Sequence, residues 1–232
     1  MDRLGAAAEA LAGTIRFYMR IICISDTHGR HGDLVIPDGD FLIHAGDFTN
    51  YGNAPEPYLK FDEWLGSLPH PYKIIVPGNH EFLLEEPRMR GIIKNASLLI
   101  DAGVMVAGLR VWGSPVTPLY GAAFGMSHSN DRRRHWAKMP DDTDILITHG
   151  PPFGILDHVT GTQRKEGDLE LLEAVLRINP PLHIFGHAHS YHGQIEMGST
   201  LFVNAALPYG GVLKPPIVTE LPRNFKVHNR KV

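Results

Sequence analysis

Cysteine is nearly absent from the 232-residue chain, whose one cysteine, Cys23, can form no internal disulfide. Disulfides belong to oxidising compartments, so this composition favours a reducing one, and we expect a cytoplasmic protein. Cys23 lies inside an apolar run, which indicates a buried packing residue rather than a nucleophile. The sequence therefore excludes a disulfide-stabilised fold and offers no cysteine chemistry.

Long apolar runs and a large net charge are absent as well. No apolar run approaches the roughly 18 residues of a membrane-spanning helix, so we expect no membrane segment. A formal net charge of -3 provides no basic surface for nucleic acid, which is not expected as a partner. Glu9 interrupts a small-residue stretch near the N-terminus, which argues against a signal peptide. We expect residues 1–18 to form a tail or a short helix.

The rest of the composition is that of an ordinary globular domain. Apolar residues make up 43% of the chain and charged residues 20%, which allows a sizeable core. We find no internal repeat, low-complexity segment or charged linker, so we expect a single domain over residues 19–232. Histidine is the unusual component, with 14 residues, and its distribution is the main clue to function.

Five short apolar runs, each bounded by turn residues, predict buried strands. They are Arg20–Ser25, Phe41–Ala45, Lys73–Val76, Asp144–Thr148 and Leu182–Phe185. Their nearly continuous apolar character indicates that both faces of each strand are covered. Further short strands are expected in Leu98–Ser114 and as a pair at Gly193–Met197 and Thr200–Asn204.

Two helices are clear between these strands. The first, Pro55–Leu68, ends before Pro69 and carries one apolar stripe, formed by Tyr58, Phe61, Trp64, Leu65 and Leu68. The second is capped by Asp168 and runs to about Ile178. Its expected inner face is Leu169, Leu172, Val175 and Leu176. A weaker helix is expected near Pro87–Ala96. Strands that alternate with helices and then form hairpins predict a layered α/β sandwich with a mixed sheet.

A polar group suited to metal binding follows each of the five runs. In chain order these groups are Asp26-Thr-His28, Gly46-Asp47, Gly78-Asn79-His80-Glu81, His149-Gly150 and Gly186-His187-Ala188-His189. The carboxyl ends of strands in an α/β sheet open onto the crevice where ligands bind, so we expect the five groups to converge. In an extended segment residues i and i+2 point the same way, which lets Asp26 and His28 face one centre.

The convergent groups contain two Asp, one Asn and four His, with His80 to spare, which is more than one metal ion needs. Nitrogen and hard-oxygen ligands without thiolate favour Mn, Fe, Zn or Mg over a structural zinc site. Two divalent cations about 3.5–4 Å apart can activate water and stabilise both oxygens of an in-line displacement. Each motif alone is as easily a cap or a turn. Five of them in order, each directly after a strand, predict a dinuclear metal centre.

The same series of motifs resembles the calcineurin-like metallophosphoesterase superfamily, from about Met19 to Leu207. Four stretches resemble more narrowly its metallophosphoesterase-domain (MPPED-like) branch of class III phosphodiesterases: Asp26-Thr-His-Gly-Arg30, Ile43-His-Ala-Gly-Asp47, Trp112-Gly-Ser-Pro115 and Thr148-His-Gly-Pro-Pro152. The resemblance implies a four-layer αββα sandwich of two mixed sheets flanked by helices. Some animal members of the branch carry glycine where this chain has His187, so the full set here favours a competent second metal site.

The resemblance also implies how two metal ions would share the ligands. The first would take Asp26, His28 and His189, and the second would take Asn79, His149 and His187. Asp47 would bridge the two ions. His80, next to the ligand Asn79, would contact the phosphate and protonate or stabilise the leaving oxygen.

These residues lead to the hypothesis that the chain hydrolyses a phosphodiester or a phosphomonoester, with a small diester as the first choice. A metal-bound hydroxide would attack phosphorus while His80 assists departure of the alkoxide. Arg30 can hold a phosphate oxygen through its guanidinium group, although a solvated surface arginine explains it almost as well. A small-molecule phosphoester is thus the expected partner, and no motif encodes the oligomeric state.

Two other functions fit the same motifs. A binding or scaffold protein built on this fold would have lost ligands, typically His80 or one histidine of the final pair, and this chain keeps them all. A Lewis-acidic metal pair can also act on a non-phosphate ester or in a proton transfer. Product analysis on candidate substrates would separate these possibilities from phosphoester hydrolysis.

Substrate selection is expected in two segments without regular periodicity, Pro115–Pro140 and Pro151–Gly167. The first is interpreted as a long loop with a helix near its end. Its run Arg132-Arg133-Arg134 fits an exposed charged helix face better than an anion-binding patch.

Several other residues are open to both a structural and a functional interpretation. His44, inside an apolar run, is expected to support the site through a hydrogen bond. Four histidines lie near the expected rim of the site in sequence and could touch substrate, although a structural role is the better prediction: His31, His128, His158 and His192. Three aromatic residues are expected to pack rather than to stack on a nucleobase: Trp112, Tyr120 and Trp136.

Overall fold

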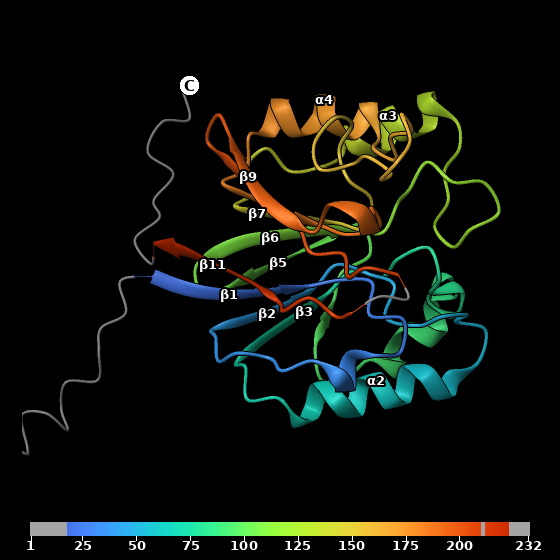
Figure 1. Cartoon of the computed structure of the whole chain (residues 1–232), viewed down its shortest axis with the longest axis vertical. Coiled ribbons are helices and arrows are strands. Elements are labelled where there is room, and N and C mark those ends of the chain that lie inside the picture. Colours follow the sequence, from blue (N-terminus) through green and yellow to red (C-terminus); the bar gives the residue numbers. More distant parts are fainter. Residues whose placement is uncertain (1–17, 210–211, 223–232) are drawn as a thin grey trace, which may run out of the picture.

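The computed structural model describes residues 18–209 and 212–222. Within them two mixed sheets lie face to face, and helices cover their outer faces (Figure 1). The layers run from helices α3 and α4, through the six-stranded sheet and the five-stranded sheet, to helix α2. The predicted four-layer αββα sandwich is therefore confirmed. The predicted N-terminal tail or helix lies outside the described residues apart from Tyr18, and the single domain stays a prediction.

The five-stranded sheet has the order β11-β1-β2-β3-β4. Its strands are β1 (Tyr18–Ile24), β2 (Phe41–His44), β3 (Tyr72–Ile75), β4 (Ser97–Leu98) and β11 (Ile217–Pro222). Strands β1 to β4 are parallel, and β11 pairs antiparallel with β1. The helices connecting its strands are η1 (His31–Asp33), α2 (Pro55–Ser67), η2 (Phe82–Glu85) and η3 (Pro87–Ile92), of which all but α2 are 3-10 helices. The weak helix expected near Pro87–Ala96 is thus the 3-10 helix η3, and β11 was not anticipated.

The six-stranded sheet has the order β5-β6-β7-β8-β10-β9. Its strands are β5 (Ala102–Val106), β6 (Leu109–Ser114), β7 (Ile145–Thr148), β8 (Leu182–Phe185), β9 (Gly193–Met197) and β10 (Thr200–Asn204). The inner four are parallel, and hairpins add β5 and β9 antiparallel at the two edges. Its helices are α3 (Ser129–Trp136), α4 (Leu169–Ile178) and the 3-10 helix η4 (His189–Tyr191). No helix of the described residues is long and apolar enough to cross a membrane.

The main core lies between the two sheets, and the alternation of side chains along β1 shows how it forms. Ile21 and Cys23 point into the core shared with the six-stranded sheet, whereas Ile22 and Ile24 pack under α2. Both faces of the strand are therefore apolar and covered, as the sequence predicted. Cys23 is completely buried, and this burial raises the pKa of its thiol, which suits a packing residue.

The two long helices differ in how well their buried faces were predicted. In α2 the expected stripe is correct, with Tyr58, Phe61 and Leu65 fully buried. In α4 the expected face is correct for Val175, which is buried, and for Leu172, which is partly buried, but wrong for Leu169 and Leu176, which are 49% and 69% exposed. The buried positions are Leu171, Ala174, Val175 and Ile178, together with Glu170. Both stripes have helical spacing, and the observed one also carries the polar contacts of Glu170 with α3.

Arg132 provides those contacts and corrects the prediction of an exposed arginine face. It is only 8% exposed, whereas Arg133 and Arg134 lie on the surface. The Arg132 guanidinium donates to Asp168 at 3.0 Å and to Glu170 at 2.9 Å. Asp168 also accepts the indole N–H of Trp136 at 2.8 Å, so it caps α4 and fixes α3 at once. The expected packing of Trp112 and Trp136 is observed, but Tyr120 is 93% exposed.

Replacing Arg132 with Leu should lower the free energy of unfolding by about 3–5 kcal/mol, because the buried carboxylates of Asp168 and Glu170 lose the guanidinium that both contact most closely. The matched control is Arg134→Leu, which breaks an exposed pair with Asp131 on the same helix and should cost about 1 kcal/mol or less. Urea denaturation of the three proteins measures both values. Equal destabilisation by the two substitutions would contradict the role given to Arg132.

Candidate metal centre

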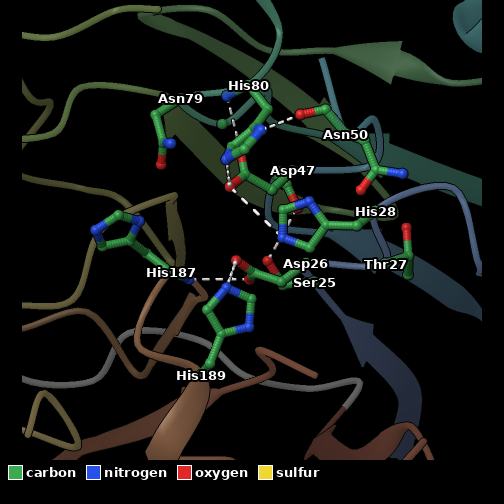
Figure 2. A network of polar contacts seen from close by, with 12 residues as sticks. Ser25, Asp26, Thr27, His28, Asp47, Asn50, Asn79, His80, His187 and His189 are labelled. Atoms are coloured by element: carbon green, nitrogen blue, oxygen red, sulfur yellow. Dashed lines mark hydrogen bonds and ion pairs between the residues drawn. The ribbon is translucent and has the colours of Figure 1, made fainter. Parts of the chain in front are cut away.

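The predicted ligands come together at one edge of the sandwich, where strands of both sheets end. Figure 2 shows side chains from both sheets converging on the Asp26 and Asp47 carboxylates. Three groups have ligand atoms within 4.8 Å of one another: Asp26 with His28 and His189, His28 with Asp47 and His80, and Asp47 with His149 and His187. Asn79 joins them through its side-chain oxygen, 2.9 Å from His149 Nε2. The structure therefore brings together all seven predicted ligands and His80.

The backbone that presents these side chains is strained. Asp26, His28, Asp47 and His187 all have positive φ, between 44° and 65°, a conformation that costs free energy in non-glycine residues. The loops also pass very close to the ligands. A Cβ atom at Gly186 would lie 2.3 Å from Asp26 Oδ2, so only glycine fits there. Such strain persists only where the surrounding structure enforces it, and four of the candidate ligands carry it.

Four histidines of the cluster are held in the same orientation by backbone carbonyl groups. The Nδ1 atoms of His28, His149 and His189 lie 3.1, 2.8 and 2.5 Å from the carbonyl oxygens of Thr49, Ala45 and Leu207. His80 Nδ1 makes the same contact with the carbonyl of Asn50. Because a carbonyl oxygen only accepts, each Nδ1 must carry the proton, which leaves Nε2 facing the carboxylates. Metal-binding histidines are typically oriented in this way.

The spacing between these Nε2 atoms and the carboxylates fits a shared cation. Asp47 Oδ2 lies 3.4 Å from His149, 3.7 Å from His80 and 4.0 Å from His28, and Asp26 Oδ1 lies 3.6 Å from His189. These distances exceed a hydrogen bond, but they suit two ligands that each approach one ion to about 2.0–2.2 Å. Asp26 Oδ1 and His28 Nε2 are buried and make no hydrogen bond within the described residues. The donor set therefore fits divalent metals.

Burial makes the charges of the cluster depend on one another. Burial opposes the charged form of His149, but the Asp47 and Asp26 carboxylates outweigh it and raise the pKa of His149 to about 10. Burial likewise opposes ionisation of Asp47, yet His149 and His80 lower the pKa of Asp47. Burial, with a smaller contribution from His149, lowers the pKa of His187 to about 4, so this ring is neutral and can act as a ligand. A cation next to Asp47, either a proton or a metal, is strongly favoured.

Glu81 has a role that sequence reasoning missed, although it belongs to a quoted motif. Its fully buried carboxylate accepts hydrogen bonds from the backbone N–H groups of Asp47, Thr49 and Gly78 at 2.6–2.9 Å. The Thr49 hydroxyl donates a fourth bond at 2.8 Å. Burial and the nearby Asp47 charge raise the pKa of Glu81 to about 7, whereas the donated bonds favour the ionised form. Glu81 thus joins the loops after β2 and β3 and fixes the position of Asp47.

A cavity of about 280 Å³ opens beside Asp26 and His28. The predicted substrate-binding residue Arg30 lines it, together with Asn50 and the segment around Tyr209. The two segments expected to select substrate lie next to the ligands instead. Ala123 donates to the carbonyl of Asn79, and Thr160 donates to the Ser190 hydroxyl beside His189. Neither segment lines this cavity. The part of its lining that sequence reasoning did not anticipate is the segment after β10.

The other singled-out histidines have structural contacts. His44 accepts from the Gly46 N–H at 3.2 Å and lies 3.0 Å from the Thr27 hydroxyl, between two ligand loops, as expected. His31 is buried against Phe61 and Trp64 rather than facing substrate. Three more do not line the cavity beside Asp26: His128, His158 and His192.

Fold and site together define a layered α/β protein whose histidine and aspartate clusters can hold divalent metals. The chain belongs to the calcineurin-like phosphoesterase family, whose model matches residues 19–191. It is 41% identical to human metallophosphoesterase domain-containing protein 1 over 88% of this chain and 72% of the human protein. A UPF0046 protein of Caenorhabditis elegans is 40% identical over 89% of this chain and 76% of its own length.

A solved structure shares the fold of this chain. One solved crystal structure, 16% identical, superposes with a TM-score of 0.63 over 82% of this chain and 91% of its own. At that identity the likeness shows the fold alone. The predicted resemblance to the metallophosphoesterase-domain branch is confirmed, and family membership supports metal-dependent hydrolysis of phosphoesters.

Replacing Glu81 with Gln should lower stability by about 2 kcal/mol or more, because an amide NH2 group would face buried N–H donors. The loops that hold Asp47 would then move, and metal affinity should fall by about 10- to 100-fold. The matched control is Glu85→Gln, whose carboxylate accepts one exposed bond from Phe124. Denaturation and calorimetric metal titration measure both effects. Unchanged metal affinity in Glu81→Gln would refute the positioning role.

Proposed function

We propose that the chain is a metal-dependent phosphoesterase that hydrolyses a small phosphodiester at a dinuclear metal centre. The observation that carries this proposal is the ring of Nε2 atoms held 3.4–4.0 Å from two buried carboxylates. One ion would be held by Asp26, His28 and His189, and the other by Asn79, His149 and His187. Asp47 would contact both. The O,N donor set admits Mn, Fe, Zn or Mg and does not choose among them.

The bound metals would supply a Lewis acid that activates water and neutralises charge at phosphorus. The chain's own contribution begins with Asp47, whose two oxygens have different partners. Oδ1 accepts the backbone N–H of His80 at 2.9 Å, while Oδ2 faces the imidazoles. Because Glu81 fixes the Asp47 backbone, this carboxylate is held in place before substrate arrives.

His80 is the proposed catalytic acid. Its side chain is partly exposed, and the Asn50 carbonyl holds its Nδ1–H, so Nε2 is directed toward the site next to Asp47. In its protonated form His80 can donate the Nε2 proton to the departing alkoxide. Together with Asn79, which precedes it in the chain, it would also contact the phosphoryl oxygens.

Substrate binding is assigned to the cavity beside Asp26. Arg30 lies on its wall and offers a guanidinium to an anionic oxygen. Phosphomonoesters carry one organic group and diesters carry two, and each group needs room beside the metal centre. The cavity provides room for one such group, which is compatible with the proposed diester.

The alternatives have less support. A scaffold protein would not need the complete ligand set, and here all the ligand atoms converge. Chemistry on a non-phosphate ester has no observation of its own in its favour. A cytoplasmic location remains a prediction, which cell fractionation would test.

The direct test uses metal-stripped protein and bis-p-nitrophenyl phosphate, with Mn, Fe, Zn and Mg returned separately. Hydrolysis should require metal. Asp47→Asn should lose both bound metal and turnover, because the amide is a poorer bridging ligand for two ions.

His80→Ala should bind as much metal as the native protein while its turnover falls by about 100-fold or more, the usual loss when a general acid is removed. The metal content of each protein is measured by elemental analysis alongside its hydrolysis rate. Normal turnover in His80→Ala would remove this residue from the mechanism. A protein that binds two metals but hydrolyses no phosphoester would overturn the proposed function.

A further inference from the structure

The segment that follows β10 runs directly along the metal-binding edge. Leu207 donates its N–H to the carbonyl of Ser25, next to Asp26, at 3.2 Å. Its own carbonyl accepts the Nδ1–H of His189. Leu207 is therefore tied to the chain at two ligand positions, one from each sheet, and Tyr209 follows it by two residues. These hydrogen bonds of Leu207 place Tyr209 beside the site.

The Tyr209 ring stands against two of the ligand histidines. Its centroid lies 5.7 Å from that of His28 and 5.6 Å from that of His189, at interplanar angles of 79° and 77°. Such edge-to-face contacts hold an aromatic ring in a defined orientation. Yet Tyr209 is 73% exposed, so packing accounts for only part of its surface. The remaining surface borders the 280 Å³ cavity.

The cavity lining combines two kinds of surface. Polar groups, including Asp26, His28 and Arg30, lie next to an apolar and aromatic set formed by Leu207, Pro208, Tyr209 and Leu213. The Tyr209 ring joins the two, because it packs against His28. A ligand whose phosphate sits at the metal ligands can therefore place its attached organic group against Tyr209.

We propose that Tyr209 determines substrate specificity by stacking on a flat, uncharged ring in the non-reacting ester group of the substrate. The favoured substrates are then phosphodiesters with an aromatic or heteroaromatic group on the side of the cavity. The inference rests on the proposed phosphoesterase function, because it places the phosphate at the metal ligands. The ring is already oriented by His28 and His189, so stacking costs little additional ordering.

The test measures binding, so that it does not depend on turnover. Calorimetry on metal-loaded protein compares phenylphosphonate, cyclohexylphosphonate and methylphosphonate, which share the anionic group and differ in the organic one. Native protein should prefer phenyl to cyclohexyl by about two- to tenfold, the range expected for an aromatic pair. Tyr209→Phe should keep this preference. Tyr209→Leu, which retains apolar bulk without a π-face, should abolish it.

The control is Tyr18→Leu, which removes an exposed tyrosine at the start of β1, far along the strand from Asp26. It should leave the preference unchanged. An equal loss of affinity for all three phosphonates in Tyr209→Leu would overturn the inference, because it would show a general effect on the metal ligands. An unchanged preference in that variant would overturn it as well.

Hydrolysis of bis-p-nitrophenyl phosphate by the same preparations separates the two proposals. Phosphonate binding with the stated preference but without hydrolysis would reject the proposed function and retain the role of Tyr209 as a binding residue. Hydrolysis without a phenyl preference would retain the function and reject the role of Tyr209.

Discussion

The carboxylate of Glu81 is the contact on which the geometry of the metal centre depends. Its hydrogen bonds from the backbone of Asp47, Thr49 and Gly78 join two loops that follow neighbouring strands. Those loops carry Asp47, Asn79 and His80, and the Thr49 carbonyl in turn orients His28. A buried anion is costly unless it is fully hydrogen-bonded, and here both oxygens are used twice. The free energy gained from these four bonds offsets the strain of positive φ at Asp47.

The two sheets depend on each other at the same place. His149, from the six-stranded sheet, donates its Nδ1–H to Ala45 at the end of β2 in the other sheet. Asp26, at the end of β1, accepts the backbone N–H of His187 at 2.9 Å. The ligands therefore reach their positions only when the apolar faces of both sheets have packed together. Because the unfolded chain has no such site, metal binding should be coupled to the packing of the core.

Much of this could be predicted from local sequence. Strands such as Leu182–Phe185 are short apolar runs with no competing signal, and β8 has those same bounds. The ligands follow the strands at fixed, short distances, so their convergence required parallel strands within each sheet and packing of the two sheets with those strand ends at one edge. What escaped prediction depends on contacts between distant residues. Both faces of α4 have helical spacing, and the observed orientation places Asp168 and Glu170 in contact with Arg132, which lies 36 residues before Asp168 in the chain. A run of three arginines gives no sign that its first member is internal.

Sequence reasoning missed the segment after β10 that lines the cavity, around Leu207 and Tyr209, for a related reason. Segments 115–140 and 151–167 attracted attention because they are long and irregular, whereas the cavity is bordered by a short stretch after β10 that contains no motif. Parallel pairing of β10 with β8 is what brings Leu207 and Tyr209 beside His189, because it makes both strands end at the same edge. The candidate metal ligands are recognisable from their chemistry alone. The residues proposed to meet the rest of the substrate are ordinary apolar and aromatic side chains, and only the order of strands in the sheet places them at the site.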